Sequence, residues 1–224
     1  IGALVEIDCG AGRCGAQGPE AAVAIARAIA EAPGLRFEGL QAYQGGLQHI
    51  ETWADRTAAF ARARAATQAA VDGLSAAGLQ PGVVTGGGTG SWRMEAASGL
   101  WTEVQCGSYA LMDADYGRVL GPDGRRMDAA EFENALFLLT QVMSAPAPGR
   151  GVCDAGLKSM TAESGLPTIP GRPDLRVTGI SDEHTEVAGP LSVGDRLRMV
   201  PGHCDPTINL HDWLVAVRGG MVEA

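Results

Sequence analysis

Apolar positions in the first half of the chain follow two spacings that alternate. Short apolar runs, each closed by glycine, alternate with longer, alanine-rich stretches in which apolar residues recur every three to four positions. The first spacing is typical of strands and the second of amphipathic helices. The pattern predicts strands at 3–8, 37–43, 81–85 and 103–106, and helices at 18–32, 51–77 and 92–98.

The second half has a different pattern. Strand-like runs lie at 137–144, 151–155, 175–180, 196–200 and 213–217, separated by turns rich in proline and glycine. In the first half, strand–helix alternation predicts parallel strands with helices outside, and four such strands make half of an eight-stranded barrel. We therefore predict an α/β fold, with half of a (β/α)8 TIM-type barrel over residues 1–128 and a β-rich domain over residues 129–224.

Composition narrows the class of protein. The 224 residues include 17 Lys+Arg and 26 Asp+Glu, a formal net charge of −9. So acidic a chain argues against a nucleic-acid or membrane-surface partner, which would need a basic face. No apolar run approaches the roughly 18 residues of a membrane span, and there is no signal-peptide pattern. The five cysteines are odd in number and irregularly spaced, which favours a reducing, cytoplasmic compartment.

Lysine is rare in this chain. Lys158 is the only one, because the remaining 16 of the 17 basic residues are arginine. Any reaction that needs a lysine imine must therefore use Lys158 or a residue outside the chain. Lys158 lies in the β-rich half, far in sequence from the glycine-rich motifs described next, and a structural role is predicted for it.

Two glycine-containing motifs follow neighbouring predicted strands. Gly86–Gly90 (GGGTG) comes after the third strand and before a short helix, and Cys106–Tyr109 (CGSY) comes after the fourth. Glycines at such corners let backbone N–H groups converge on an anion. The two corners together suggest one phosphate held from two sides, as in many barrels. Either corner alone is equally compatible with ordinary turn glycines, and no Gly-Lys-Ser/Thr follows, so this is not a P-loop.

A polar cluster near the C-terminus includes His203, Cys204 and Asp205. In an extended segment, His203 and Asp205 project to one face and Cys204 to the other. An imidazole and a carboxylate suit a divalent metal that keeps open positions for water or substrate. Spacing alone favours a turn with a hydrogen-bonded histidine. Arg13 could reach an anionic oxygen or form a surface salt bridge, and Tyr43 could line the same site or pack in the core.

Taken in order, these runs resemble the fold-type III pyridoxal phosphate enzymes. Their fifth to eighth barrel strands are matched by Val5–Gly15, Gly39–Gly45, Thr85–Gly90 and Gln105–Tyr109. Asp154–Ser159, Glu183-His184 and His203–Thr207 resemble the C-terminal β domain of one branch: the D-threonine aldolases, with the D-serine and D-threo-3-hydroxyaspartate dehydratases beside them. The resemblance covers nearly the whole chain. It implies the C-terminal half of the barrel followed by a β-rich C-terminal domain.

The resemblance also implies roles for individual residues. Pyridoxal 5′-phosphate would be bound through its phosphate and ring by Gly87, Gly88, Thr89, Gly107, Ser108 and Tyr109. Arg13 would contact the ring's phenolate oxygen, and Tyr43 would line the site. His203 and Asp205 would bind a divalent metal and act in catalysis through it, with Mn²⁺ expected first and Zn²⁺ or Mg²⁺ as alternatives. The dehydratases of D-serine carry cysteine where Asp205 stands, so the carboxylate favours the aldolase.

The implied activity is retro-aldol cleavage of a D-β-hydroxy-α-amino acid to glycine and an aldehyde by a homodimer. β-Elimination, as in the dehydratases, is the alternative. The family's Schiff-base lysine lies near the start of the barrel, and no matching segment is present before Ile1. The chain is therefore expected to work with a missing N-terminal half of the same enzyme. A further alternative is an inactive fragment that binds phosphate or metal.

Overall fold

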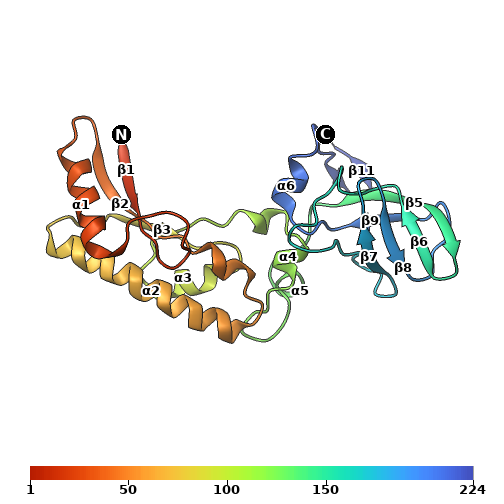
Figure 1. Ribbon diagram of the computed structural model, residues 1–224, viewed down its shortest axis with the longest axis horizontal. Coiled ribbons are helices and arrows are strands. Elements are labelled where there is room, and N and C mark those ends of the chain that lie inside the picture. The colour runs from red at the N-terminus through yellow and green to blue at the C-terminus, as the bar shows by residue number, and fades with distance from the viewer. Residues whose placement is uncertain (224) are drawn as a thin grey trace. The chain divides into compact units, whose positions relative to one another are not determined.

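Four parallel strands form the sheet of the first half (Figure 1). They are β1 (Gly2–Glu6), β2 (Arg36–Gln41), β3 (Val83–Gly86) and β4 (Glu103–Val104), and they lie in the order β1-β2-β3-β4. The computed structural model describes residues 1–223. These residues form two units, one made of residues 1–109 and 118–130 and the other of residues 110–117 and 131 onward. The parallel order matches the predicted half-barrel.

Helices cover one face of this sheet. They are α1 (Gly18–Glu31), α2 (Trp53–Ala76) and α3 (Trp92–Ser98). Shorter elements are the 3-10 turns η1 (Gly45–His49) and η2 (Ser108–Ala110) and the four-residue helix α5 (Met127–Ala130). Pro19 is the second residue of α1, and the Thr52 side chain caps α2 by accepting a hydrogen bond from Asp55 N–H. Apolar residues of alternate strand positions pack against the helices. The core includes Val5, Ile7, Leu40, Val84, Ala22, Ala26, Phe60, Leu74 and Met94.

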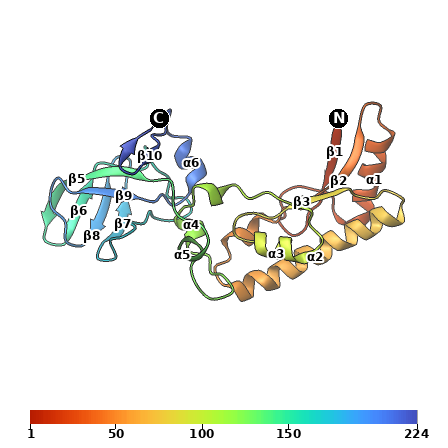
Figure 2. The same ribbon diagram turned by 180° about the vertical axis from the view of Figure 1, so that it is seen from behind.

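The second unit is mainly an antiparallel sheet (Figure 2). Its strands are β5 (Leu138–Ala147), β6 (Arg150–Cys153), β7 (Arg176–Ile180), β8 (Thr185–Ala188) and β9 (Arg196–Met199), in the order β7-β8-β6-β5-β9. Two short helices, α4 (Ala114–Gly117) and α6 (Cys204–Ile208), and a small hairpin of β10 (Val217–Arg218) and β11 (Met221–Val222) complete it. The buried core includes Val142, Cys153, Met160, Val187, Leu197 and Met199.

The structure confirms the predicted α/β class and corrects details of it. The helix at 92–98 has the predicted bounds, and the strands of the first half agree to within three residues at their ends. Of the strand predicted at 213–217, only Val217 lies in a strand, at the start of β10, and residues 213–216 are wrong. Trp213 is 86% exposed and its neighbours pack in no core. β8 was not predicted. Within residues 1–223, none of the helices combines the length and the apolar character that crossing a membrane requires.

Candidate functional site

In the corner after β3, the backbone of the glycines lies directly against the side chains of Gln48 and Tyr43. Residues 84–91 are all buried, and Gly87 has a positive φ of 71°. A Cβ atom added at Gly88 would lie 2.5 Å from Oε1 of Gln48 and 3.0 Å from the hydroxyl of Tyr43. Contacts this short leave no room for a side chain, so glycine is required for the backbone to pass here. The predicted cofactor-binding residues Gly88 and Tyr43 are thus brought together.

The corner after β4 is joined to the corner after β3. Backbone N–H of Tyr109 donates to Oγ1 of Thr89 over 3.0 Å, and Thr89 itself is buried. Among residues 1–223, the backbone N–H groups of Thr89 and Gly107 donate to no acceptor. Ser108 starts η2 beside them. The structure therefore places two available donors on two linked corners, which suits an anion such as a phosphate.

Arg13 lies near the same corner. Its guanidinium carbon is 5.9 Å from the centre of the Tyr43 ring, and its Nη2 is 3.5 Å from Oε1 of Glu6. The Arg13 side chain is 61% exposed, so the contact with Glu6 is weak and the cation remains accessible. A glycine cradle, available N–H groups and a nearby cation fit the phosphate and the anionic ring oxygen of pyridoxal 5′-phosphate.

A network of buried hydrogen bonds holds the backbone of the corner after β3. Nε2 of Gln48 donates to Oγ of Ser91 over 2.8 Å, and Gly90 N–H donates to Oε1 of Gln48 over 2.8 Å. Gly88 N–H makes a longer contact of 3.4 Å with the same Ser91 oxygen. Ser91 also hydrogen-bonds to Glu95, which is only 2% exposed. Burial raises the pKa of the Glu95 carboxyl from 4.5 to about 7, although the Ser91 hydrogen bond opposes this.

A second polar network crosses the sheet. Oγ1 of Thr85 donates to Oε1 of Glu103 over 2.8 Å, and Nε2 of Gln105 donates to Oγ1 of Thr85 over 3.0 Å. Gln105 also donates to Oε1 of Gln41 over 2.5 Å. Alternation along the strands separates these side chains from those that pack on the helices. They therefore form a hydrophilic lining on the side of the strands that faces inward in a barrel.

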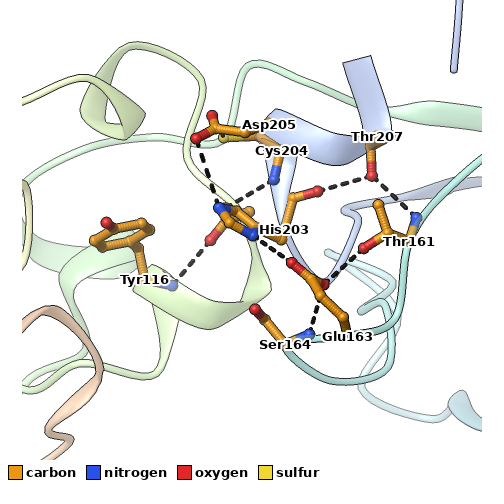
Figure 3. Close-up of polar contacts among 9 residues, drawn as sticks. Tyr116, Thr161, Glu163, Ser164, His203, Cys204, Asp205 and Thr207 are labelled. Atoms are coloured by element: carbon orange, nitrogen blue, oxygen red, sulfur yellow. Dashed lines mark hydrogen bonds and ion pairs between the residues drawn. The ribbon is translucent and has the colours of Figure 1, made fainter. Parts of the chain in front are cut away.

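His203 is the centre of a polar cluster in the second unit (Figure 3). Its Nδ1 lies 2.5 Å from Oε1 of Glu163, and its Nε2 lies 3.7 Å from Oδ2 of Asp205. His203 has extended backbone and precedes α6, whose first turn contains Asp205 and Pro206. The extended backbone that was considered for this segment therefore stops at His203, because proline near the helix start favours α6. The two predicted ligands nevertheless face each other.

Glu163 is held in place on both sides. Its Oε2 accepts hydrogen bonds from Oγ1 of Thr161 and from N–H of Ser164, each over 2.7 Å (Figure 3). The Thr207 hydroxyl donates to the carbonyl of His203 over 2.7 Å, and Thr161 N–H donates to the Thr207 oxygen. These bonds fix the histidine ring from its backbone and from Nδ1. With Nδ1 directed at Glu163, Nε2 is the nitrogen left for a ligand.

Two buried groups lie behind the histidine. Asp113 is fully buried, and its carboxylate accepts hydrogen bonds of 2.9 Å from N–H of Tyr116 and N–H of Cys204. Burial raises the pKa of Asp113, and burial raises the pKa of the Cys204 thiol to about 12. Burial also disfavours the charged form of His203, but the hydrogen bond with Glu163 and the nearby carboxylates outweigh it, so its pKa is raised.

The His203–Asp205 pair fits a divalent metal that takes only two protein ligands. Metal–nitrogen and metal–oxygen bonds of about 2.0–2.2 Å place two ligands of one ion roughly 3 to 3.5 Å apart, close to the observed 3.7 Å. Over residues 1–223, no group of three or more His, Cys, Asp or Glu side chains is arranged to hold a metal. Cys204 is 1% exposed. The donors available to a metal here are therefore the imidazole nitrogen of His203 and the carboxylate oxygens of Asp205.

The remaining predicted residue, Lys158, is engaged elsewhere in the second unit. Its Nζ lies 2.6 Å from Oε1 of Glu183 at an exposed position. Sequence reasoning did not identify Glu163, Asp113, Gln48, Ser91 or Glu95. The pairing of Glu163 with His203 spans 40 residues, and no local motif signals it. Glu95 offered a weak signal as an acid on the buried face of a short helix after a glycine-rich corner.

Comparison with known proteins finds two family models. The alanine racemase N-terminal domain matches residues 1–115, and the putative serine dehydratase domain matches residues 135–217. The chain is 55% identical to a 3-hydroxy-D-aspartate aldolase of Paracoccus denitrificans (strain Pd 1222), with 100% of the chain covering 58% of that protein. It is 47% identical to a D-threonine aldolase of Arthrobacter sp, covering 59% of it.

A solved structure resembles the chain closely. The crystal structure of D-threonine aldolase from Filomicrobium marinum superposes with a TM-score of 0.92 at 41% identity, over 100% of this chain and 62% of that one. The chain thus spans about three fifths of the length of the relatives it matches. The three relatives named here are aldolases.

Proposed function

Because the chain belongs to the alanine racemase N-terminal domain family, we propose that it serves the retro-aldol cleavage of D-β-hydroxy-α-amino acids. The reaction would use pyridoxal 5′-phosphate and a divalent metal, and would release glycine and an aldehyde. The observation that carries the proposal is the Glu163–His203–Asp205 arrangement, which offers a nitrogen and a carboxylate oxygen to a metal. Aldolases acting on 3-hydroxy-D-aspartate and D-threonine among the relatives support the reaction class.

The cofactor would be held by the two linked corners of the first unit. The N–H groups of Thr89 and Gly107 would donate to its phosphate, and the Ser108 hydroxyl lies beside them. Arg13 would donate to the anionic ring oxygen, and Tyr43 would pack at the same site. When bound, pyridoxal 5′-phosphate supplies an electron sink for the breaking Cα–Cβ bond. The sparse contacts of Arg13 leave it able to reorient toward such an oxygen.

His203 and Asp205 would hold the metal, and Glu163 would keep the imidazole in one orientation. A divalent metal supplies Lewis acidity that lowers the pKa of a substrate hydroxyl. In the neutral imidazole, a hydrogen bond from Nδ1–H to Glu163 would leave Nε2 as the nitrogen with a lone pair for the metal, directed away from Glu163. Nitrogen and carboxylate donors suit Mn²⁺, Zn²⁺ or Mg²⁺, and among these we propose Mn²⁺, since the buried Cys204 provides no thiolate.

Product analysis tests the proposal directly. The chain, together with the N-terminal half that is expected to supply the lysine, is incubated with pyridoxal 5′-phosphate, Mn²⁺ and D-threonine or D-3-hydroxyaspartate. Cleavage gives glycine with acetaldehyde or glyoxylate, whereas elimination gives ammonia with 2-oxobutanoate or oxaloacetate. Asp205→Asn should abolish the metal-dependent part of the rate, and His211→Gln in the same unit is the matched control. Formation of neither set of products would refute the proposal.

Elimination is the second candidate. The observation that favours it is the match of residues 135–217 to the putative serine dehydratase domain. The same donors would hold the metal, and the β-hydroxyl would depart as water instead of giving up its proton. Oxo acid and ammonia, with no glycine, would establish this activity and exclude the aldolase.

A further inference from the structure

The carboxyl of Glu95 lies directly against the corner that we propose binds the phosphate. A Cβ atom added at Gly87 would be 2.9 Å from Cδ of Glu95 and 3.2 Å from its Oε2. Glu95 is 2% exposed, and Oε2 has no hydrogen-bond partner among residues 1–223. A carboxylate with one bare oxygen in such a place is unusual, because an unpaired buried charge is strongly disfavoured.

A hydrogen-bond path connects Glu95 to the same corner. The oxygen of Ser91 accepts from Nε2 of Gln48 and, over 3.4 Å, from N–H of Gly88. The Ser91 hydroxyl can therefore use its single proton to donate to the carboxyl of Glu95, with which it forms a hydrogen bond. The charge state of Glu95 therefore acts on the corner in two ways, through space at Gly87 and through Ser91 at the N–H of Gly88.

Few charged groups act on the Glu95 carboxyl. Arg56 of α2 lowers the pKa of Glu95 by its charge, but burial dominates and raises that pKa. The guanidinium of Arg56 is itself occupied by the carbonyls of Ile50 and Leu120, each 2.6 Å away. The other titratable groups that sense Glu95 are the thiols of Cys9, after β1, and Cys106, after β4. Both thiols are neutral at physiological pH, because burial raises their pKa values.

We propose that Glu95 is a positioning residue that couples phosphate binding at the Gly86–Gly90 corner to a proton, so that the corner binds the cofactor's phosphate tightly only with Glu95 protonated. This inference rests on the proposed function. A phosphate brought beside an ionised, buried carboxylate repels it, and the repulsion is relieved when the carboxyl takes up a proton. By reciprocity, binding of the phosphate raises the affinity of Glu95 for that proton. Cofactor retention then weakens as the pH rises above neutrality.

A cofactor analogue measures this coupling without catalysis. 4′-Deoxypyridoxine 5′-phosphate has no aldehyde, so it needs no lysine to bind. Its dissociation constant is measured at pH 6, 7, 8 and 9 for the wild type, for Glu95→Gln and for Glu20→Gln, an exposed acid of α1 in the same unit. Ionisation of the analogue itself is common to all three proteins and cancels in their ratios.

The expected result is a pH-dependent ratio. The wild-type dissociation constant, divided by that of Glu95→Gln, should be close to one at pH 6 and rise at least fivefold by pH 9. Glu20→Gln should follow the wild type. Calorimetry at pH 8 in two buffers of different ionisation enthalpy should show proton uptake by the wild type that exceeds uptake by Glu95→Gln.

The outcomes separate this inference from the function on which it rests. Binding with a ratio that stays constant from pH 6 to 9, and equal proton uptake, overturns the role of Glu95 and leaves the cofactor site standing. No binding by any of the proteins at any pH overturns the cofactor site and the inference together. Circular dichroism of each variant verifies that the comparison is made between folded proteins.

Discussion

Replacing Glu95 with glutamine should change how stability depends on pH, even with no ligand present. Burial raises the pKa of Glu95 in the folded protein from 4.5 to about 7. The folded state therefore holds a proton that the unfolded state has released, between about pH 4.5 and 7. Over that window the wild type loses stability as the pH rises. The loss is complete above about pH 7, which is the reverse of the trend for a carboxylate in a salt bridge.

The magnitude follows from the size of the shift. A difference of about 2.5 pKa units at about 1.4 kcal/mol each gives roughly 3 kcal/mol over the whole window. Between pH 5 and pH 8 the expected loss is about 2 to 3 kcal/mol, because part of the loss has already occurred at pH 5. Glutamine keeps the shape and does not ionise, so Glu95→Gln should lack this loss.

Urea unfolding followed by tryptophan fluorescence measures the difference. Trp53, Trp92 and Trp101 all lie in the first unit. Trp213 is already 86% exposed in the folded protein, so its fluorescence should change little on unfolding. The free energy of unfolding of Glu95→Gln, relative to the wild type, should rise by about 2 to 3 kcal/mol from pH 5 to pH 8. An equal difference between the two proteins at both pH values would show that Glu95 is ionised in the folded state and would refute the reasoning.

The remaining predictions concern the cofactor corner, the metal ligands and the lysine. Gly88→Ala should weaken binding of the cofactor analogue at least tenfold, because its Cβ meets the buried Gln48 side chain at 2.5 Å. Gly82→Ala, whose Cβ would meet nothing nearer than 3.4 Å and which lies outside the proposed site, should bind normally in the same titration. Glu163→Gln should weaken Mn²⁺ binding by about 10- to 100-fold in calorimetry, because the imidazole of His203 loses the carboxylate that orients it. Glu186→Gln, at an exposed position, should bind Mn²⁺ as the wild type does. Equal affinities of all three proteins would contradict the positioning role of Glu163. Lys158→Arg should retain product formation, since an arginine keeps the surface ion pair; loss of activity would instead assign the lysine to the chemistry.

The sequence was sufficient where local chemistry decides the structure. α3 has the predicted bounds because glycines lie on both sides of it, and Gly99 ends it with a positive φ of 70°. The parallel sheet was also predictable, since buried runs alternating with helical stretches have few other arrangements. By contrast, residues 213–217 have a strong β-forming composition but pack against no core, and composition carries no information on packing partners.

The candidate site was predictable only in part. His203 and Asp205 could be selected from a short motif, but their facing arrangement depends on α6 and not on an extended backbone through residues 203–205. Glu163 reaches His203 across 40 residues, and Glu95 matters because the fold buries it beneath a loop. Such roles arise from tertiary contacts, so a single sequence without the fold does not reveal them.

The hydrogen bond between Tyr109 N–H and Thr89 has a consequence for the kinetics of cofactor exchange. It joins two loops that are 20 residues apart in the chain. Because this bond links the two loops of the site, binding of an anion requires little loop closure. Little conformational entropy is then lost on association. Variants that alter affinity at this site should therefore differ mainly in how long the cofactor stays, and much less in how quickly it enters.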